Sequence, residues 1–194
     1  MRQGGNMELV MATPEEINAI HSTFNKFNIH LMEDPQNLFG FIGIMDVFHS
    51  VLNEEEASEL LGAGHHIKHG AKFVNTFRDL MDFSGQEVYI HLYKKAIGKE
   101  QKKYVLSCLS RTEAKVFRNL FSNNKGVYKV GDHEALVFLT KLSVNELVFA
   151  NFFFPSLDSV VIGNYDLSFP VYSKTLRGFS TCRELAEKNN LFIR

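Results

Sequence analysis

The chain has 194 residues, 45% of them hydrophobic and 22% charged, and a formal net charge of −1. This length and composition exclude a disordered chain and a small disulfide-stapled fold, and they are typical of a globular protein with a conventional core. No apolar run approaches the ~18 residues of a membrane-spanning helix, so we expect no membrane segment.

The charge is distributed unevenly along this nearly neutral chain. Residues 1–70 carry ten acidic and three basic side chains, residues 71–131 carry five acidic and twelve basic ones, and residues 132–194 are close to neutral. Such a split predicts two differently built parts and at least one surface that faces a charged partner.

The first part is predicted to be helical. Residues 1–12 are expected to be a flexible N-terminus. Thr13 and Glu16 have the spacing of a capping box at the start of a helix, and Asn53 caps another helix. Apolar residues at helical spacing predict a buried helix within residues 38–52 and a further helix over residues 67–83. Ser84-Gly85 then ends the helical part, which spans residues 13–84.

The second part, residues 85–194, is predicted to be α+β. Period-two alternation indicates a strand from Val88 to Leu92, and residues 104–109 suggest a second strand of a hairpin. Ser110 begins a helix that extends to about Phe121. Strands are predicted at 127–130, 136–142, 147–154, 160–162, 167–172 and 191–193, and a last helix from Thr181 to Lys188. A second capping pattern at Ser143 leaves a helix over residues 144–153 as an alternative.

The fold class that follows is α+β, with a helical N-terminal part packed on a mainly antiparallel sheet that carries two further helices. We expect helix to dominate before Ser84 and strand to dominate from Gln86 to Tyr172. The opposite charges of the two parts favour their docking into one compact unit.

Five lysines form the strongest local charge and are the candidate binding residues. They lie between the two predicted hairpin strands, at Lys94, Lys95, Lys99, Lys102 and Lys103. A basic hairpin tip could contact an acidic protein surface or a nucleic-acid backbone, although lysines also suit a solvated tip that discourages edge aggregation. The helix from Ser110 would open a helix-turn-helix, but a strand is predicted where its second helix should be. Nucleic-acid binding is therefore not expected.

Histidines supply the candidate metal ligands and catalytic groups. His65 and His69 have the i,i+4 spacing of two ligands on one helix face, but no third ligand is adjacent, so no bound zinc is expected. No nucleophile elbow or phosphate-binding loop is present, and no cofactor is predicted. An enzyme, either a hydrolase or a transferase, would need a site assembled from some of the scattered residues His65, His69, His91, Asp158 and Asp166.

The sequence thus favours a non-catalytic binding protein, such as one of an inhibitor or immunity type, over a small enzyme. Cys108 and Cys182 fit no disulfide framework, which favours a reducing cytoplasm. Gln3-Gly4-Gly5 before Met7 is what a purine-rich ribosome-binding site would encode if it were translated. This pattern suggests a bacterial source and translation from Met7. The expected partner is another protein.

Overall fold

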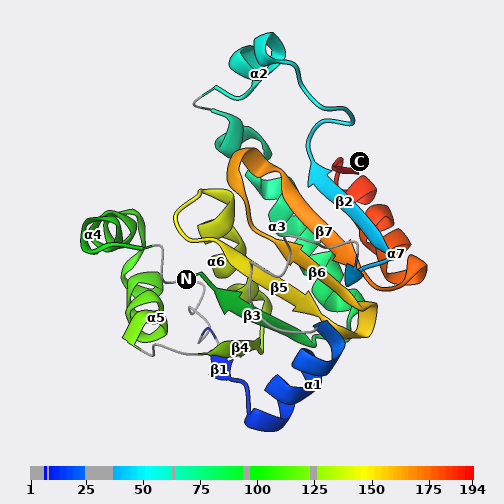
Figure 1. The fold of residues 1–194 in the computed structure, drawn as a ribbon. Helices are drawn as coiled ribbons and strands as arrows, with labels where there is room; N and C mark the ends of the chain where they lie inside the picture. The colour runs from blue at the N-terminus through cyan, green and yellow to red at the C-terminus, as the bar shows by residue number, and fades with distance from the viewer. Residues whose placement is uncertain (1–6, 8, 25–36, 63, 94–96, 123–125) are drawn as a thin grey trace.

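The fold was analysed in a computed structural model, which describes residues 7, 9–24, 37–62, 64–93, 97–122 and 126–194. Within this part of the chain, seven helices accompany an eight-stranded antiparallel sheet (Figure 1), so the predicted α+β class is confirmed. The helices are α1 (Pro14–Phe24), α2 (Glu54–Leu60), α3 (His65–Phe83), α4 (Lys99–Cys108), α5 (Arg111–Ser122), α6 (His133–Val144) and α7 (Leu176–Lys188).

The strands form one sheet in the order β1-β4-β3-β5-β6-β7-β2-β8. They are β1 (Leu9–Met11), β2 (Phe41–Asp46), β3 (Val88–Leu92), β4 (Val127–Val130), β5 (Ala150–Phe154), β6 (Ser159–Ile162), β7 (Phe169–Ser173) and β8 (Phe192–Ile193). Short 3₁₀ turns follow β5 (Pro155–Leu157) and β6 (Tyr165–Leu167). Strands from both sides of Ser84 therefore share the sheet, and β1 lies within the segment expected to be a flexible N-terminus.

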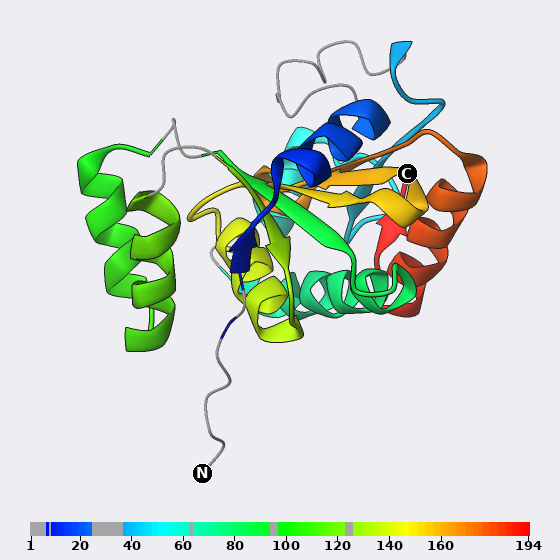
Figure 2. The ribbon, with the colours of Figure 1, turned by 90° about the horizontal axis from the view of Figure 1, so that it is seen from below.

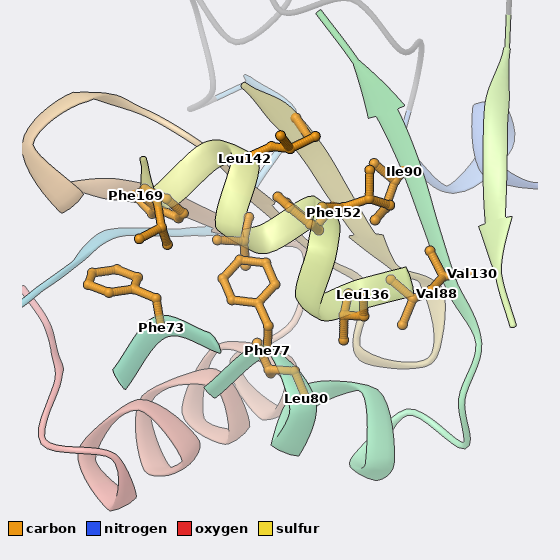
Figure 3. Packing of buried hydrophobic residues seen from close by; sticks show 14 of the residues in the cluster. Phe73, Phe77, Leu80, Val88, Ile90, Val130, Leu136, Leu142, Phe152 and Phe169 are labelled. Atoms are coloured by element: carbon orange, nitrogen blue, oxygen red, sulfur yellow. The ribbon is translucent and has the colours of Figure 1, made fainter. Parts of the chain in front are cut away.

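Helices cover both faces of the sheet. Figure 2 shows α1 on one face and α3, α6 and α7 on the other. Consecutive strand residues point to opposite faces, so Phe153 packs under α1 while Phe152 and Phe154 belong to the larger core. Phe77 of α3 lies against Phe152 with ring centroids 4.5 Å apart, and Figure 3 shows Phe73 and Phe77 pointing from α3 toward the sheet.

Local capping chemistry starts several helices where the sequence predicts them. Thr13 and Glu16 bond to each other's backbone N–H, at 3.2 and 2.9 Å. The same reciprocal pattern joins Asn53 to Glu56 before α2. These short-range contacts satisfy N–H groups that the first helical turn leaves unpaired.

A polar cluster fastens α1 to the sheet. Glu16 accepts hydrogen bonds from Lys129 Nζ at 2.8 Å and from the Tyr89 hydroxyl at 3.1 Å. The bond from Lys129, with that from the Thr13 N–H, lowers the pKa of Glu16 to about 2. Burial and the Glu16 carboxylate raise the pKa of Tyr89 to about 12.

The predicted helix at 38–52 is wrong, because residues 41–46 form strand β2. Its apolar side chains occur at helical spacing, but β2 lies between β7 and β8 and is covered by α7. A Cβ atom at Gly43 would lie 2.5 Å from Ile193 Cγ2 and 3.1 Å from the Phe179 ring. Gly43 therefore permits the close approach of neighbouring elements in the sheet, a role that glycine often has in strands.

The strand predicted at 136–142 is also wrong, and helix α6 occupies this region. Asp132 caps the helix, with its carboxylate accepting from the Ala135 N–H at 2.8 Å. Nearly every residue from Ala135 to Val144 is buried. A helix that is apolar on most sides resembles a buried strand in sequence, because its hydrophobic face has no clear period.

Some of the remaining predictions for the C-terminal region are confirmed, and others are wrong. Strands β5, β6, β7 and β8 confirm the predictions at 147–154, 160–162, 167–172 and 191–193, whereas the alternative helix at 144–153 is wrong. The last helix begins at Leu176, capped by Thr175, rather than at Thr181. The region after Ser84 contains α4, α5, α6 and α7, so strand does not dominate it and the expected number of helices was too low.

Candidate functional site

Helices α4 and α5 form a pair at one side of the body, which we call the α4–α5 pair (residues 99–122). Figures 1 and 2 both show the two helices side by side, next to the β1 end of the sheet. Val105, Phe117 and Leu120 are buried and anchor the pair to the core. Lys102 Nζ lies 5.2 Å from the centre of the Phe121 ring, which joins α4 to α5.

The structure corrects the predicted basic hairpin. Residues 104–109 were predicted to form a strand, but residues 99–108 form α4, and Gly98 precedes its first turn. The run from Lys99 to Lys103 consists of good helix formers, and the apolar run that follows is too short to distinguish strand from helix. Helix α4 therefore precedes α5, and the next element after α5 is strand β4 rather than a helix.

The five candidate lysines do not share one tip. Lys99 and Lys103 are exposed on α4, and Lys103 pairs with Glu100 at 2.8 Å. Lys102 is half-buried against Phe121. Lys94 and Lys95 lie outside the described residues. Residues 97–122 nevertheless carry six basic and two acidic side chains, so this pair of helices is the basic part of the structure.

A cleft of about 440 Å³ with a mixed polar and apolar lining, which we call the groove, separates this pair from α6 and the first turn of α3. Its lining residues come from α3, α4, α5, α6 and the segments that follow α4 and α6. They are His66, Ile67, Tyr104, Cys108, Leu109, Glu113, Phe138, Lys141, Leu142, Asn145 and Leu147.

Two large apolar side chains stand exposed at the groove. Ile67 is 87% exposed and Tyr104 is 63% exposed, while Phe138 and Leu142 beneath them are buried. Exposed aromatic and aliphatic side chains beside a concave apolar surface are characteristic of protein interaction sites.

Some polar side chains of the groove already bind other groups of the protein, and one of them has no such contact among the described residues. Glu113 accepts from the Ser110 N–H at 2.9 Å as part of the cap of α5. His66 Nε2 lies 3.6 Å from Glu146 Oε1, and the same Glu146 oxygen accepts from the Asp166 N–H at 2.8 Å. Lys141 has no ion pair among the described residues. Its charge is therefore available to a partner.

His65 lies at the start of α3 and is only 4% exposed. Its ring is stacked on Phe48, with centroids 5.8 Å apart, and lies 5.1 Å from the ring of His69. Neither ring nitrogen makes a hydrogen bond of good geometry within the described structure, although the nearby Asp166 backbone favours the charged ring. Burial lowers the pKa of His65, and the neighbouring His66 lowers it further. The neutral imidazole thus behaves mainly as a flat packing group.

The candidate metal ligands do not form a complete site. Within the described ranges no three His, Cys, Asp or Glu side chains are grouped as a metal site requires. The absence of bound zinc remains a prediction for elemental analysis to test.

Three of the five scattered residues of the enzyme hypothesis lie together, and the other two lie elsewhere. His65, His69 and Asp166 lie near one another at the start of α3. His91 is on β3, opposite Asn151 of β5. Asp158 follows the turn after β5, where its backbone carbonyl accepts from the Lys174 N–H. The structure therefore offers no single place where these five groups could act together.

A histidine–aspartate pair that the sequence did not predict joins α6 to α3. His133 Nε2 lies 2.9 Å from Asp82 Oδ1, beside a polar cleft of about 430 Å³. The other nitrogen, Nδ1, is buried without a partner. A general base needs a nitrogen that can reach the substrate proton, and neither nitrogen of His133 is placed for that.

A buried ion pair near the end of β2 was likewise not predicted. Asp46 Oδ2 accepts from Arg194 Nη2 at 2.8 Å and from the Ser168 hydroxyl at 3.0 Å, and Oδ1 accepts from the Phe48 N–H. These bonds compensate the burial of the carboxylate. These bonds connect residues that are far apart in sequence, so no local sequence motif predicts the ion pair.

Comparisons with protein family models, with curated proteins and with solved structures found no match to this chain. None of the helices that the structure describes is long and apolar enough to cross a membrane. The candidate site must therefore be judged from its own chemistry. The groove combines exposed apolar side chains with concavity, and the α4–α5 pair that forms one of its walls has a net positive charge.

Proposed function

We propose that this protein is a non-catalytic binding protein that recognises an acidic surface of another protein through the groove. The observation that carries the proposal is the pair of exposed side chains, Ile67 and Tyr104, at a cleft whose floor includes the buried Phe138 and Leu142. Burying them against a partner would remove large apolar areas from water. Tyrosine is among the residues that contribute most to protein interfaces.

Charge supports an acidic partner. The α4–α5 pair has four more basic than acidic side chains, and at the groove itself Lys141 of α6 balances Glu113 of α5, so the positive excess surrounds the groove rather than lining it. Complementary charge around an apolar centre speeds association and selects the partner, whereas the apolar centre supplies most of the affinity. An inhibitor or immunity-type protein would use a surface of this kind.

We further propose that the protein acts in the cytoplasm of a bacterium. Cys108 and Cys182 are both free thiols, and Cys108 is exposed. Free exposed thiols persist most readily in a reducing compartment.

The test compares partner capture by the wild type and by two double variants. Ile67→Ser with Tyr104→Ser removes the apolar side chains at the groove. Val51→Ser with Leu176→Ser removes two other exposed apolar side chains from outside the groove and is the matched control. Each bait is tagged and incubated with bacterial lysate at equal concentration, and the captured proteins are quantified by mass spectrometry.

The proposal predicts an acidic protein whose capture falls at least tenfold with the groove variant and is unchanged with the control. Such a loss corresponds to about 1.4 kcal/mol, which is modest for two central interface residues. Equal capture by all three baits would refute the proposal. If both variants lose the same proteins, the capture reflects general stickiness rather than the groove.

A further inference from the structure

Strand β1 forms one edge of the sheet and leaves backbone groups available. Among the described strands it pairs only with β4. The Ala12 N–H donates to the Val127 carbonyl at 3.0 Å, so Ala12 and Val10 direct their backbone groups toward β4. Because these directions alternate along a strand, Leu9 and Met11 direct theirs to the open side. Such an edge is a template for another strand.

A large cleft borders this edge. It has a volume of about 860 Å³ and lies between Met7 and Leu9 on one side and helix α5 on the other. Arg111 and Lys115 line the α5 side, and neither has an ion pair among the described residues. The described lining residues include no carboxylate. The cleft therefore has the strand edge at Leu9 on one wall, and on the other wall two cationic side chains that have no ion pair among the described residues.

We infer that this edge binds an extended acidic segment of a protein partner, which adds to the sheet beside β1. The backbone of the segment would pair with Leu9 and Met11, and its carboxylates would face Arg111 and Lys115. Strand addition of this kind gains affinity from main-chain hydrogen bonds and selectivity from side-chain contacts. This second surface does not include the groove residues Ile67 and Tyr104.

Charge and chemistry favour this occupant over two others. A second copy joined edge to edge would bring two sets of Arg111 and Lys115 close together, which like-charge repulsion opposes. A single-stranded nucleic acid would complement the charge, but its usual binding sites stack bases on aromatic rings. The described lining of this cleft contains no aromatic residue.

The experiment selects linear peptides from a random displayed library on the intact protein. An enriched peptide is then synthesised, and its affinity is measured by fluorescence anisotropy. Met11→Pro removes the outward N–H while leaving the bonds to β4 unchanged, because proline is tolerated on the open side of an edge strand. Met11→Ala keeps that N–H and is the matched control. Lys115→Glu tests the charge without altering the strand.

We expect enriched peptides to be rich in Asp and Glu, and to bind about tenfold more weakly to Met11→Pro and to Lys115→Glu. Met11→Ala and the Ile67→Ser/Tyr104→Ser groove variant should bind as the wild type does. Thermal unfolding of each variant verifies that it is folded. Because the groove variant should leave peptide binding at the β1 edge intact, a failure of this inference can be distinguished from a failure of the proposed function.

Four results would overturn the inference. One is a selection without acidic enrichment, and another is peptide binding that Met11→Pro leaves unchanged in a folded variant. The third is an oligonucleotide of deoxythymidine that outcompetes the peptides and is sensitive to Lys115→Glu alone, which would assign the cleft to nucleic acid. Concentration-dependent dimers that Met11→Pro abolishes would instead assign the edge to a second copy.

Discussion

The helices α3, α6 and α7 and the α4–α5 pair contact the rest of the protein in different ways. The first three cover one face of the sheet and bury a continuous cluster that includes Phe73, Phe77 and Phe169 (Figure 3). The pair packs on the core through side chains such as Val105 and Phe117, but its backbone does not approach another element as closely as those of the three helices do. It carries exposed apolar and basic groups instead. The comparison suggests that stability resides in the three-helix layer and recognition in the pair.

The largest effect should come from Phe77→Ala in the three-helix layer. Phe77 is fully buried and packs against Phe152, Phe154 and Phe169. Removing such a ring costs about 3–5 kcal/mol of unfolding free energy. Phe83→Ala on the same helix is the control, because Phe83 is 52% exposed and its loss should cost less than ~0.5 kcal/mol. Denaturant unfolding measures both, and equal costs would contradict the assignment of the core.

A smaller and more local effect is expected from Phe117→Ala in the α4–α5 pair. Phe117 is buried and its ring lies 4.4 Å from that of Phe121. Because the pair lies at one side of the body and Phe117 is one of the buried side chains that hold it there, this change should open α4 and α5 before the rest unfolds. Hydrogen exchange should show lost protection in residues 99–122 and little change in α3 and α6. Uniform loss across the molecule would show that the pair is part of the same cooperative unit.

Helix α1 belongs to neither of these two regions, and its contribution to the unfolding free energy should depend on pH. The pKa of Glu16 is lowered in the folded state to about 2, below its ordinary value of 4.5. The unfolded chain therefore binds the proton more readily, so this stabilisation is present above pH 4.5 and is lost as the pH falls toward about 2.

Glu16→Gln tests this ionic contribution. The variant should be less stable than the wild type at neutral pH, and the difference should shrink in acid and in high salt, since Lys129 is partly exposed. Unfolding curves across this pH range measure it, with Glu15→Gln as the control on the exposed side of α1. A difference that stays constant with pH would exclude the ionic contribution.

The smallest effect on stability should come from Lys99→Glu combined with Lys103→Glu on α4. Both side chains are exposed, so the unfolding free energy should change by less than ~0.5 kcal/mol for each. Association with an acidic partner should slow markedly at low salt and approach the wild-type rate at high salt. Arg177→Glu on α7 is the control. Wild-type association at both salt concentrations would mean that these lysines are only solvated.

Sequence reasoning succeeded where neighbouring residues decide the structure. The caps at Thr13, Asn53 and Ser110 act within one helical turn, so their residues alone specify the helix starts. It failed for short apolar runs. Residues 41–46 and 104–109 have patterns that suit either helix or strand, and the choice was made by distant partners such as Ile193 beside Gly43.

The groove could not be predicted from the sequence, because two of the helices that form it were assigned incorrectly. The groove has walls from α4 and α6, and both helices were predicted as strands. The basic residues of 97–122 were recognised from composition, because charge counts do not depend on the fold. Their arrangement on a helical pair could not be recognised, and neither could the exposure of Tyr104 and Ile67.

The position of β2 bears on how the chain folds during synthesis. Both sheet neighbours of β2 come from the last quarter of the sequence, and its Asp46 bonds to Arg194 across 148 positions. On a ribosome β2 would emerge long before either neighbour exists, and such distant pairings are slow to form. Nascent chains that stop before β7 should therefore expose β2 and recruit chaperones.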